Sequence, residues 1–418
     1  MPVPPRLETP TLFDDEAGGG ADGDDPAIWV HPTRPGRSLV VVTKKDAGLS
    51  VYDLAGRELQ AVTPPPAPGP DDAAGRFNNV DLVYGFRLGG RKVDLAVVTD
   101  RGHDRLRAFV IDPGAAAAGD PPLHDVTAPD APLVFSADQD QVNEQTTAYG
   151  LATWHDRRAG AAWAFVSQRH RRAVAKARLV ADGRRVTYRV VASLTLPGSF
   201  RLPDGSSWRP CGEPGEEPQV EGMVVDTRAQ VLYAAQEDVG VWRMGVDLGR
   251  TRPSLVDRVR EFGVPASFDE AAEECVVDWS ADPGVGGEYL SADAEGLTIY
   301  YGRGRRGYLL ASSRGDGTFA VYRRTGGNRF LGSYRIVDRG PVDGVQDSDG
   351  AAVVNLPLGR RFPAGLLVVH DGQNTPEVAG PDGEPRANTN FKYVAWPDLA
   401  GAFDPPLLID PTAGEPRG

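Results

Sequence analysis

Six polar residues each open a short apolar segment, and their side chains are of kinds that bind or surround cations. The segments DPAIWV, NVDLVY, YGLATW, EGMVVD, EGLTIY and DGAAVV begin at Asp25, Asn79, Tyr149, Glu221, Glu295 and Asp349, and nearby acids add Asp24, Asp81, Asp293 and Asp343. If the fold gathers these carboxylates, they raise one another's pKa, and a divalent cation relieves the repulsion. Oxygen ligands without Cys or a recurring His favour a hard ion. Ca²⁺ takes roughly six to eight oxygens in variable geometry, so it fits better than Mg²⁺.

A second set of polar residues lies in loops that follow the next apolar strand of each unit. These residues are Lys44, Lys45, Asp100, Arg101, Arg169, Glu237, Asp238, Arg314, Asp371 and Asn374. Calcium alone would not need lysines and arginines beside the acids. Metal ions together with Lys and Arg neutralise phosphate and stabilise the charge of a phosphoryl-transfer transition state. The combination therefore predicts hydrolysis of a phosphate ester by metal-activated water.

Both sets belong to a unit of about sixty residues that recurs six times. The second strands of the six copies begin at Leu39, Leu95, Trp163, Leu232, Leu309 and Leu366, and the segment NFKYVAW is the candidate partner of the last. Short β-rich strands repeated at this period predict an all-β, six-bladed β-propeller with mostly four antiparallel strands per blade. Equivalent loops of all blades then meet at one mouth of the central channel. A β-sandwich is the alternative, but sandwiches do not repeat a paired motif six times.

Composition limits the partners and the organisation of the chain. The formal charge of −13 over 418 residues argues against a nucleic-acid-binding face. No apolar run approaches the roughly 18 residues of a transmembrane helix, so we expect no membrane partner. We expect a flexible N-terminal segment (1–20), one propeller domain (21–400) and a C-terminal tail (401–418), acting as a monomer. Residues 1–20 lack the regions of a signal peptide, so the chain either stays inside or begins after a removed signal.

Each candidate taken alone has a more ordinary explanation. An acid before an apolar strand is usually a turn residue, and Lys44-Lys45 would suit a solvated hairpin. Arg169 lies in the run RHRR, which fits a basic surface loop. Cys211 and Cys275 allow a disulfide, which the sequence leaves open, and no zinc-ligand spacing surrounds them. The functional interpretation depends on the convergence of the whole set.

The same segments resemble those of the β-propeller phytases. The matching stretches are DDPAIWVHP, TKK, NNVD, AYG, EGM, EDVGVW, AEGLTIYY, GYLLASS, DSDG, FPAGLLVVHDGQN and ANTNFKYVAW. They extend from Asp24 to Trp396, and DDPAIW together with EGLTIYY is specific. The chain departs from the family pattern at Arg169-His170, where Lys-Glu is frequent, and at Arg314, where Gln is frequent. Long insertions also surround the two cysteines.

The resemblance implies a secreted 3-phytase that acts on calcium phytate, with several Ca²⁺ ions and neighbouring phosphate sites for cleavage and affinity. From the residues and the resemblance together we assign three groups. The expected metal ligands are Asp24, Asp25, Asn79, Asp100, Glu221, Asp293, Glu295, Asp343 and Asp349. The expected catalytic residues are Lys44, Arg101, Tyr149, Arg169, Glu221 and Glu237, and the expected substrate-binding residues are Lys45, Arg314, Asp371 and Asn374.

Two other functions fit a propeller of this kind. A calcium-dependent lactonase or esterase needs one central metal and a general base, with little use for several lysines and arginines. A binding propeller without chemistry would carry aromatic or carbohydrate-type loops instead of carboxylates beside cations. The charged set therefore favours the phosphatase.

Overall fold

The structure is a computed structural model of the 418-residue chain. It describes residues 1–13, 22–250, 252–272, 274–379 and 383–413. Among these residues no helix is both long enough and apolar enough to cross a membrane.

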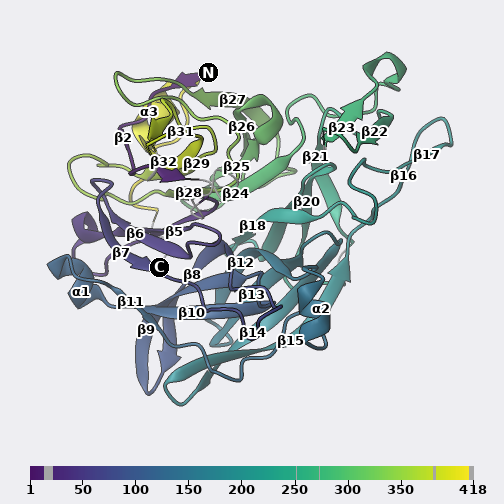
Figure 1. Ribbon diagram of the computed structural model, residues 1–418. Helices are drawn as coiled ribbons and strands as arrows, with labels where there is room; N and C mark the ends of the chain where they lie inside the picture. Colours follow the sequence, from purple (N-terminus) through teal and green to yellow (C-terminus); the bar gives the residue numbers. More distant parts are fainter. Residues whose placement is uncertain (14–21, 251, 273, 380–382, 414–418) are drawn as a thin grey trace.

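Six antiparallel sheets form the blades of a β-propeller, as the sequence predicts (Figure 1). From the inner to the outer strand, the first three blades are β4 (Pro26–Trp29), β5 (Leu39–Thr43), β6 (Leu49–Asp53), β7 (Glu58–Val62); β8 (Phe77–Leu88), β9 (Arg91–Asp100), β10 (Arg105–Ile111), β11 (Leu123–Asp125); and β12 (Ala148–Asp156), β13 (Ala161–Gln168), β14 (Ala173–Asp182), β15 (Arg185–Thr195). The next two blades are β18 (Val220–Asp226), β19 (Val231–Gln236), β20 (Gly240–Gly245), β21 (Ser254–Arg258); and β24 (Ala294–Tyr301), β25 (Gly307–Ser313), β26 (Thr318–Arg323), β27 (Phe330–Ile336). The sixth blade is β28 (Ala351–Val354), β29 (Leu366–Asp371) and β32 (Asn388–Ala395).

The N-terminal residues complete the last two blades. Strand β1 (Pro2–Val3) pairs in parallel with β27, while β2 (Leu7–Glu8) and β3 (Leu12–Phe13) pair with β32. The expectation of a flexible segment over 1–20 therefore does not fit the strands within residues 2–13, which satisfy unpaired backbone groups at the edges of β27 and β32. The remainder, 14–20, lies outside the described residues.

The C-terminal residues also pack against the propeller. Helix α3 (Trp396–Gly401) follows β32 directly, and Phe403 and Leu407 beyond it are 5% and 7% exposed. The Trp396 Nε1 donates to the carbonyl of Leu408 at 2.9 Å. The expected tail from 401 is thus part of the packed fold as far as the structure describes it.

Short elements occupy the connections between blades. They are the helices α1 (Pro113–Ala118), α2 (Gln139–Asn143), η1 (Pro35–Arg37), η2 (Trp279–Ala281) and η3 (Arg314–Asp316), and the strand pairs β16 (Phe200–Arg201) with β17 (Ser207–Trp208), β22 (Ala266–Asp269) with β23 (Glu274–Val277), and β30 (Val378–Ala379) with β31 (Pro385–Arg386). A disulfide joins Cys211, in the loop before β18, to Cys275 in β23. The pairing that the sequence left open is thus formed.

Apolar side chains fill the spaces between neighbouring blades. Phe77 and Val98 of the second blade pack with Trp29 and Val41 of the first, and equivalent clusters join each further pair around the ring. Every innermost strand neighbours the next, and β28 returns to β4. The core is therefore a closed ring of inter-blade layers, which holds six strand ends at fixed separations.

A β-bulge recurs where four inner strands begin. The register shifts lie between Phe77 and Val80, Ala148 and Leu151, Val220 and Met223, and Ala294 and Leu297. Each bulge contains one of the residues singled out from sequence: Asn79, Tyr149, Glu221 or Glu295. Bulges interrupt the alternation of a strand and re-aim side chains, so the same local irregularity turns all four side chains toward the channel mouth.

Glycines beside these residues permit adjacent inner strands to approach closely. An added Cβ would lie 2.0 Å from the Glu221 carbonyl oxygen at Gly150, 2.2 Å from that of Glu295 at Gly222, 2.5 Å from that of Asp349 at Gly296, and 2.6 Å from that of Asp24 at Gly350. The repeated acid-glycine pairs are therefore contact points between blades, and turn formation does not explain them.

We predict that Gly222→Ala lowers the free energy of unfolding by about 1–3 kcal/mol, because the new methyl group collides with the backbone of Glu295. Denaturant titration measures this loss. Gly401→Ala is the matched control, since a Cβ there meets no atom within 4 Å. Equal stability of the two variants would contradict the close-contact explanation.

Candidate metal and phosphate site

Three glutamates from two neighbouring blades form the centre of the site. Glu221 on β18, Glu237 after β19 and Glu295 on β24 each offer an oxygen, and the three oxygens lie within 4.8 Å of one another. The three residues are only 4–9% exposed. The predicted convergence of acids from separate repeats is thus confirmed for these residues.

Several of these carboxylates lack internal partners. Among the described residues, Asp24 Oδ1, Glu237 Oε1 and Glu295 Oε2 are buried without a hydrogen-bond donor. Burial, followed by the charges of neighbouring carboxylates, raises the pKa of Asp24, Glu237 and Glu295 well above the usual range. Burial and the charge of Asp293 do the same to the pKa of Asp238. Unpaired, closely spaced oxygens of this kind fit a hard divalent cation.

A hydrogen-bond chain connects the acids to the arginines. Tyr149 Oη donates to Glu221 Oε2 at 2.7 Å, and Asn78 Nδ2 donates to Glu221 Oε1 at 2.8 Å. Arg101 Nη1 in turn donates to Asn78 Oδ1 at 3.0 Å. Burial and Glu221 raise the pKa of Tyr149, so its hydroxyl remains a donor. Asn78 was not assigned from sequence, although the adjacent pair Asn78-Asn79 was the available signal.

Positive charge is concentrated beside the acids. Burial, then the charges of Arg169 and Arg76, lower the pKa of Arg101 to about 10, so the guanidinium still carries its charge at neutral pH. It lies 5.8 Å from the centre of the Tyr149 ring. Arg76, which also pairs with Asp46, was missed by sequence reasoning because it stands before the repeated motif. Three neighbouring guanidinium groups repel one another and favour a bound anion.

The two adjacent lysines, Lys44 and Lys45, have different charged surroundings. Lys45 forms an ion pair with Asp22. Burial lowers the pKa of Lys45, but the negative charges of Asp24, Asp22 and Asp349 have the larger combined effect and raise it. Burial lowers the pKa of Lys44, and the charge of Glu58 acts against that shift. Lys45 therefore lies among acids of the mouth, whereas the expected catalytic role of Lys44 stays a prediction.

Arg314 neutralises two of the expected metal ligands. Its Nη1 lies 3.3 Å from Asp293 Oδ2, and its Nε lies 3.2 Å from Asp349 Oδ1. Burial lowers the pKa of Arg314, but the negative charges of Asp349, Glu295 and Asp293 have the larger combined effect and raise it. Arg314 and Lys45 both line a hollow of about 590 Å³ at this edge of the site. This hollow also has room for an anionic group.

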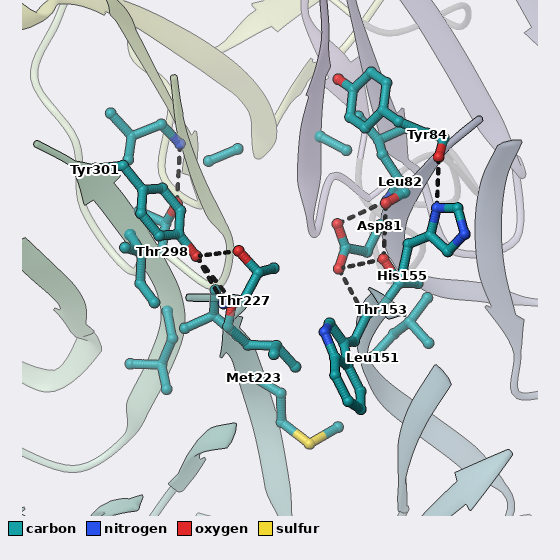
Figure 2. Close-up of a pocket in the computed structure, with 18 of the residues that line it drawn as sticks. Asp81, Leu82, Tyr84, Leu151, Thr153, His155, Met223, Thr227, Thr298 and Tyr301 are labelled. Carbon is teal, nitrogen blue, oxygen red and sulfur yellow. Dashed lines mark hydrogen bonds between the residues drawn. The ribbon is translucent and has the colours of Figure 1, made fainter. Parts of the chain in front are cut away.

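Two further acids point into the channel below the mouth. Asp25 Oδ2 accepts from the Val80 amide at 3.1 Å, and Asp81 Oδ2 accepts from the Thr153 amide at 2.6 Å. Both line the central cavity of about 690 Å³, in which Asp81 and Thr153 come from adjacent blades (Figure 2). Asn79 remains near the mouth, where its Oδ1 accepts from Asn78 at 2.9 Å.

Asp100 is held by protein groups and lies outside the acidic centre. Its Oδ2 accepts from Arg107 Nε at 2.9 Å, and its Oδ1 accepts from the Arg76 amide at 3.0 Å. Both oxygens thus accept from protein donors, and the expected role of Asp100 as a metal ligand stays a prediction.

Three other assigned residues surround the fully buried Lys392. Its Nζ pairs with Asp343, lies 3.0 Å from Asp371 Oδ2 and donates to Asn374 Oδ1 at 2.8 Å. Glu8 of the N-terminal segment completes the group at 2.6 Å. Lys392 is thus a cation that these acids share, and the expected roles of Asp343 as a metal ligand and of Asp371 as a substrate contact stay predictions. Asn374 also borders the hollow with Lys45 and Arg314.

The fold and this site define a class: a six-bladed β-propeller whose channel mouth combines carboxylates for a hard cation with arginines for an anion. Comparison with known proteins gives the family. The sequence model of the phytase family matches residues 6–193 and 215–417, so the chain belongs to the phytase family. It is 31% identical to a 3-phytase of Bacillus subtilis (strain 168) over 402 residues, which are 94% of this chain and 85% of that protein.

Among solved structures, a virginiamycin B lyase from Staphylococcus aureus covers 92% of this chain and 98% of its own, with 10% identity and a TM-score of 0.41. At that score the likeness carries no conclusion about this chain.

We predict that the chelator-treated protein becomes less stable as the pH rises from about 5 to about 8. The raised pKa values mean that the folded state binds more protons than the unfolded state above about pH 4, so stability is lost as the acids ionise. Melting temperatures measured across this range test it. Glu295→Gln should flatten the dependence, and a melting temperature that rises with pH would contradict the electrostatic explanation.

Proposed function

We propose that the chain hydrolyses phosphomonoester bonds of phytate, in a 3-phytase-like reaction that depends on calcium. Family membership supports the reaction class. The observation that carries the calcium dependence is the group of Glu221, Glu237 and Glu295, whose oxygens lie within 4.8 Å and include buried, unpaired atoms. The excess of acids without internal partners is what a hard, multiply charged cation would balance.

The acidic residues hold the metal in this proposal. Glu221, Glu237, Glu295 and Asp24 form the centre, and Asp293 and Asp349 extend it toward Arg314. Bound calcium supplies positive charge that polarises phosphate and makes water a better nucleophile. Tyr149 and Asn78 donate to Glu221, so they hold its two oxygens in fixed directions.

The cationic side chains orient the substrate. The charge of Arg169 lowers the pKa of Arg101, and in this proposal the two guanidinium groups bind phosphate together. Lys45 and Arg314 line the neighbouring hollow, where a second phosphate of the same molecule could lie. Phytate carries phosphates around one ring, so adjacent cationic places would increase affinity by engaging two of them at once.

We further propose that the chain works outside the cell, as a monomer, on phytate complexed with calcium. The disulfide Cys211–Cys275 supports the compartment, because such bonds persist in oxidising surroundings. A lactonase or esterase remains the competing enzyme. A lactonase or esterase gains nothing from three clustered arginines, because its substrate carries no phosphate. The same arginines can donate several hydrogen bonds to a phosphate dianion.

We predict that purified protein releases phosphate from phytate with added Ca²⁺ and that chelation removes both the activity and several degrees of melting temperature. Arg101→Ala should lower kcat/KM on the order of 10²-fold, because the transition-state charge loses a donor. Arg91→Ala, an exposed arginine on the same strand pair, is the matched control. Lactone hydrolysis without phosphate release would refute the proposal.

We predict that Lys45→Gln lowers phytate hydrolysis at least about tenfold, while Lys44→Gln changes it less than about twofold. The reason is that only Lys45 lies among Asp22, Asp24 and Asp349. Initial rates at saturating Ca²⁺ compare the adjacent positions directly. The reverse order would support the assignment of Lys44, and not Lys45, to the catalytic set.

A further inference from the structure

A loop tied by the disulfide touches the site through a row of hydrogen bonds. Cys211 lies five positions before Glu216, in a loop that leads to β18. The phytase-family match omits residues 194–214, so the first half of this loop is outside the shared pattern. Its tie to Cys275 in β23 joins the segments on either side of the fourth blade.

The end of this loop lies against the turn that carries Arg169. The Glu217 amide donates to the His170 carbonyl at 3.1 Å, and Arg171 Nη1 donates to the Gly215 carbonyl at 3.2 Å. Arg172 Nε donates to Glu217 Oε1 at 2.8 Å. The Glu216 carboxylate contacts His170 Nδ1. Three consecutive residues of the turn are thus attached to three consecutive residues of the loop.

His170 needs such support because its backbone has a φ of 54°. The left-handed region is unfavourable for a residue with a Cβ, so neighbouring contacts must hold it there. Arg169 directly precedes it, and among the described residues no group bonds the Arg169 guanidinium. The direction of that guanidinium therefore depends on the backbone of the turn.

Gln219 extends the same network into the metal centre. Its Oε1 accepts from the His170 amide at 2.7 Å, and its Nε2 donates to Glu237 Oε2 at 3.0 Å. The other oxygen of Glu237 is buried without a donor, and Glu237 contributes an oxygen to the acidic centre. One amide side chain thus sets the orientation of a candidate metal ligand and the position of the turn behind Arg169.

We propose that Gln219 and Glu216 are positioning residues, which align Glu237 for the cation and Arg169 for phosphate, and that the disulfide holds the segment carrying them in place. The role in substrate binding depends on the proposed function. Residues that hydrogen-bond to metal ligands orient those ligands. We therefore expect their removal to lower the affinity for the metal more than it lowers the stability of the fold.

The first test is a calcium titration followed by melting temperature, which needs no activity. Gln219→Leu keeps the size of the side chain but removes both bonds, and should raise the half-saturating Ca²⁺ concentration about tenfold. The melting temperature of the chelated protein should change little. Glu213→Gln, on the same loop but exposed, is the control and should match the unchanged protein. An unchanged half-saturation in Gln219→Leu would overturn the positioning of Glu237.

The second test is the kinetics of phytate hydrolysis at saturating Ca²⁺. Glu216→Ala and the double variant Cys211→Ser/Cys275→Ser should both raise KM about fivefold with kcat within about twofold, since they loosen a binding group. Glu216→Gln, which can still accept from His170, should restore KM. If the cysteine variant does not fold, the exposed Glu216→Ala carries the test. An unchanged KM would overturn the positioning of Arg169, whereas no phytate hydrolysis by the unchanged protein would refute the proposed function and leave the calcium titration to decide the inference.

Discussion

The close contact of each inner strand with the next determines where charge collects in this protein. A glycine in one blade faces the backbone carbonyl of an acidic residue in the following blade, at Gly150, Gly222, Gly296 and Gly350. No side chain fits between them, so the strand ends lie together and their carboxylates crowd the channel mouth. Bulges at the first three of these positions turn the side chains inward. Packing between blades thus produces the electrostatic problem that a cation would solve.

The charges around the mouth are sorted into three kinds of environment. Glu237 and Glu295 retain buried oxygens without donors, which suits a metal. Asp293 and Asp349 already share Arg314, and the acids around Lys392 share a buried ammonium group. Arg101 stands beside Arg169 and Arg76, where positive charge exceeds negative. A buried charge is costly unless it is paired, so the first and third environments mark the places where ligands would contribute most.

Segments that are remote in sequence from the site close the ring of blades and support the site. The N-terminal strands complete the last blades, and Glu8 reaches the buried Lys392. The disulfide-tied loop before β18 contacts the turn behind Arg169 and, through Gln219, the metal centre. The N-terminal strands and the disulfide-tied loop thus both limit the movement of charged side chains at the mouth, which would otherwise move apart because like charges repel.

The sequence by itself determined the number of blades, most of their strands and the acids at the mouth, because each repeat carries a polar residue before an apolar strand. It also indicated Tyr149, which opens an inner strand, and Arg101 and Glu237, which follow the second strands of their blades. Only the tertiary structure decided that Lys45 lies among acids of the mouth, and that Asp100 is bound by Arg107. The local sequence pattern predicts which strand end a residue occupies. It does not predict the residue's partner, because the partner belongs to another blade and is brought close only when the blades pack together. For the same reason Arg76 and Gln219 had no distinguishing signal until the blades were assembled, and Asn78 had only its place beside Asn79.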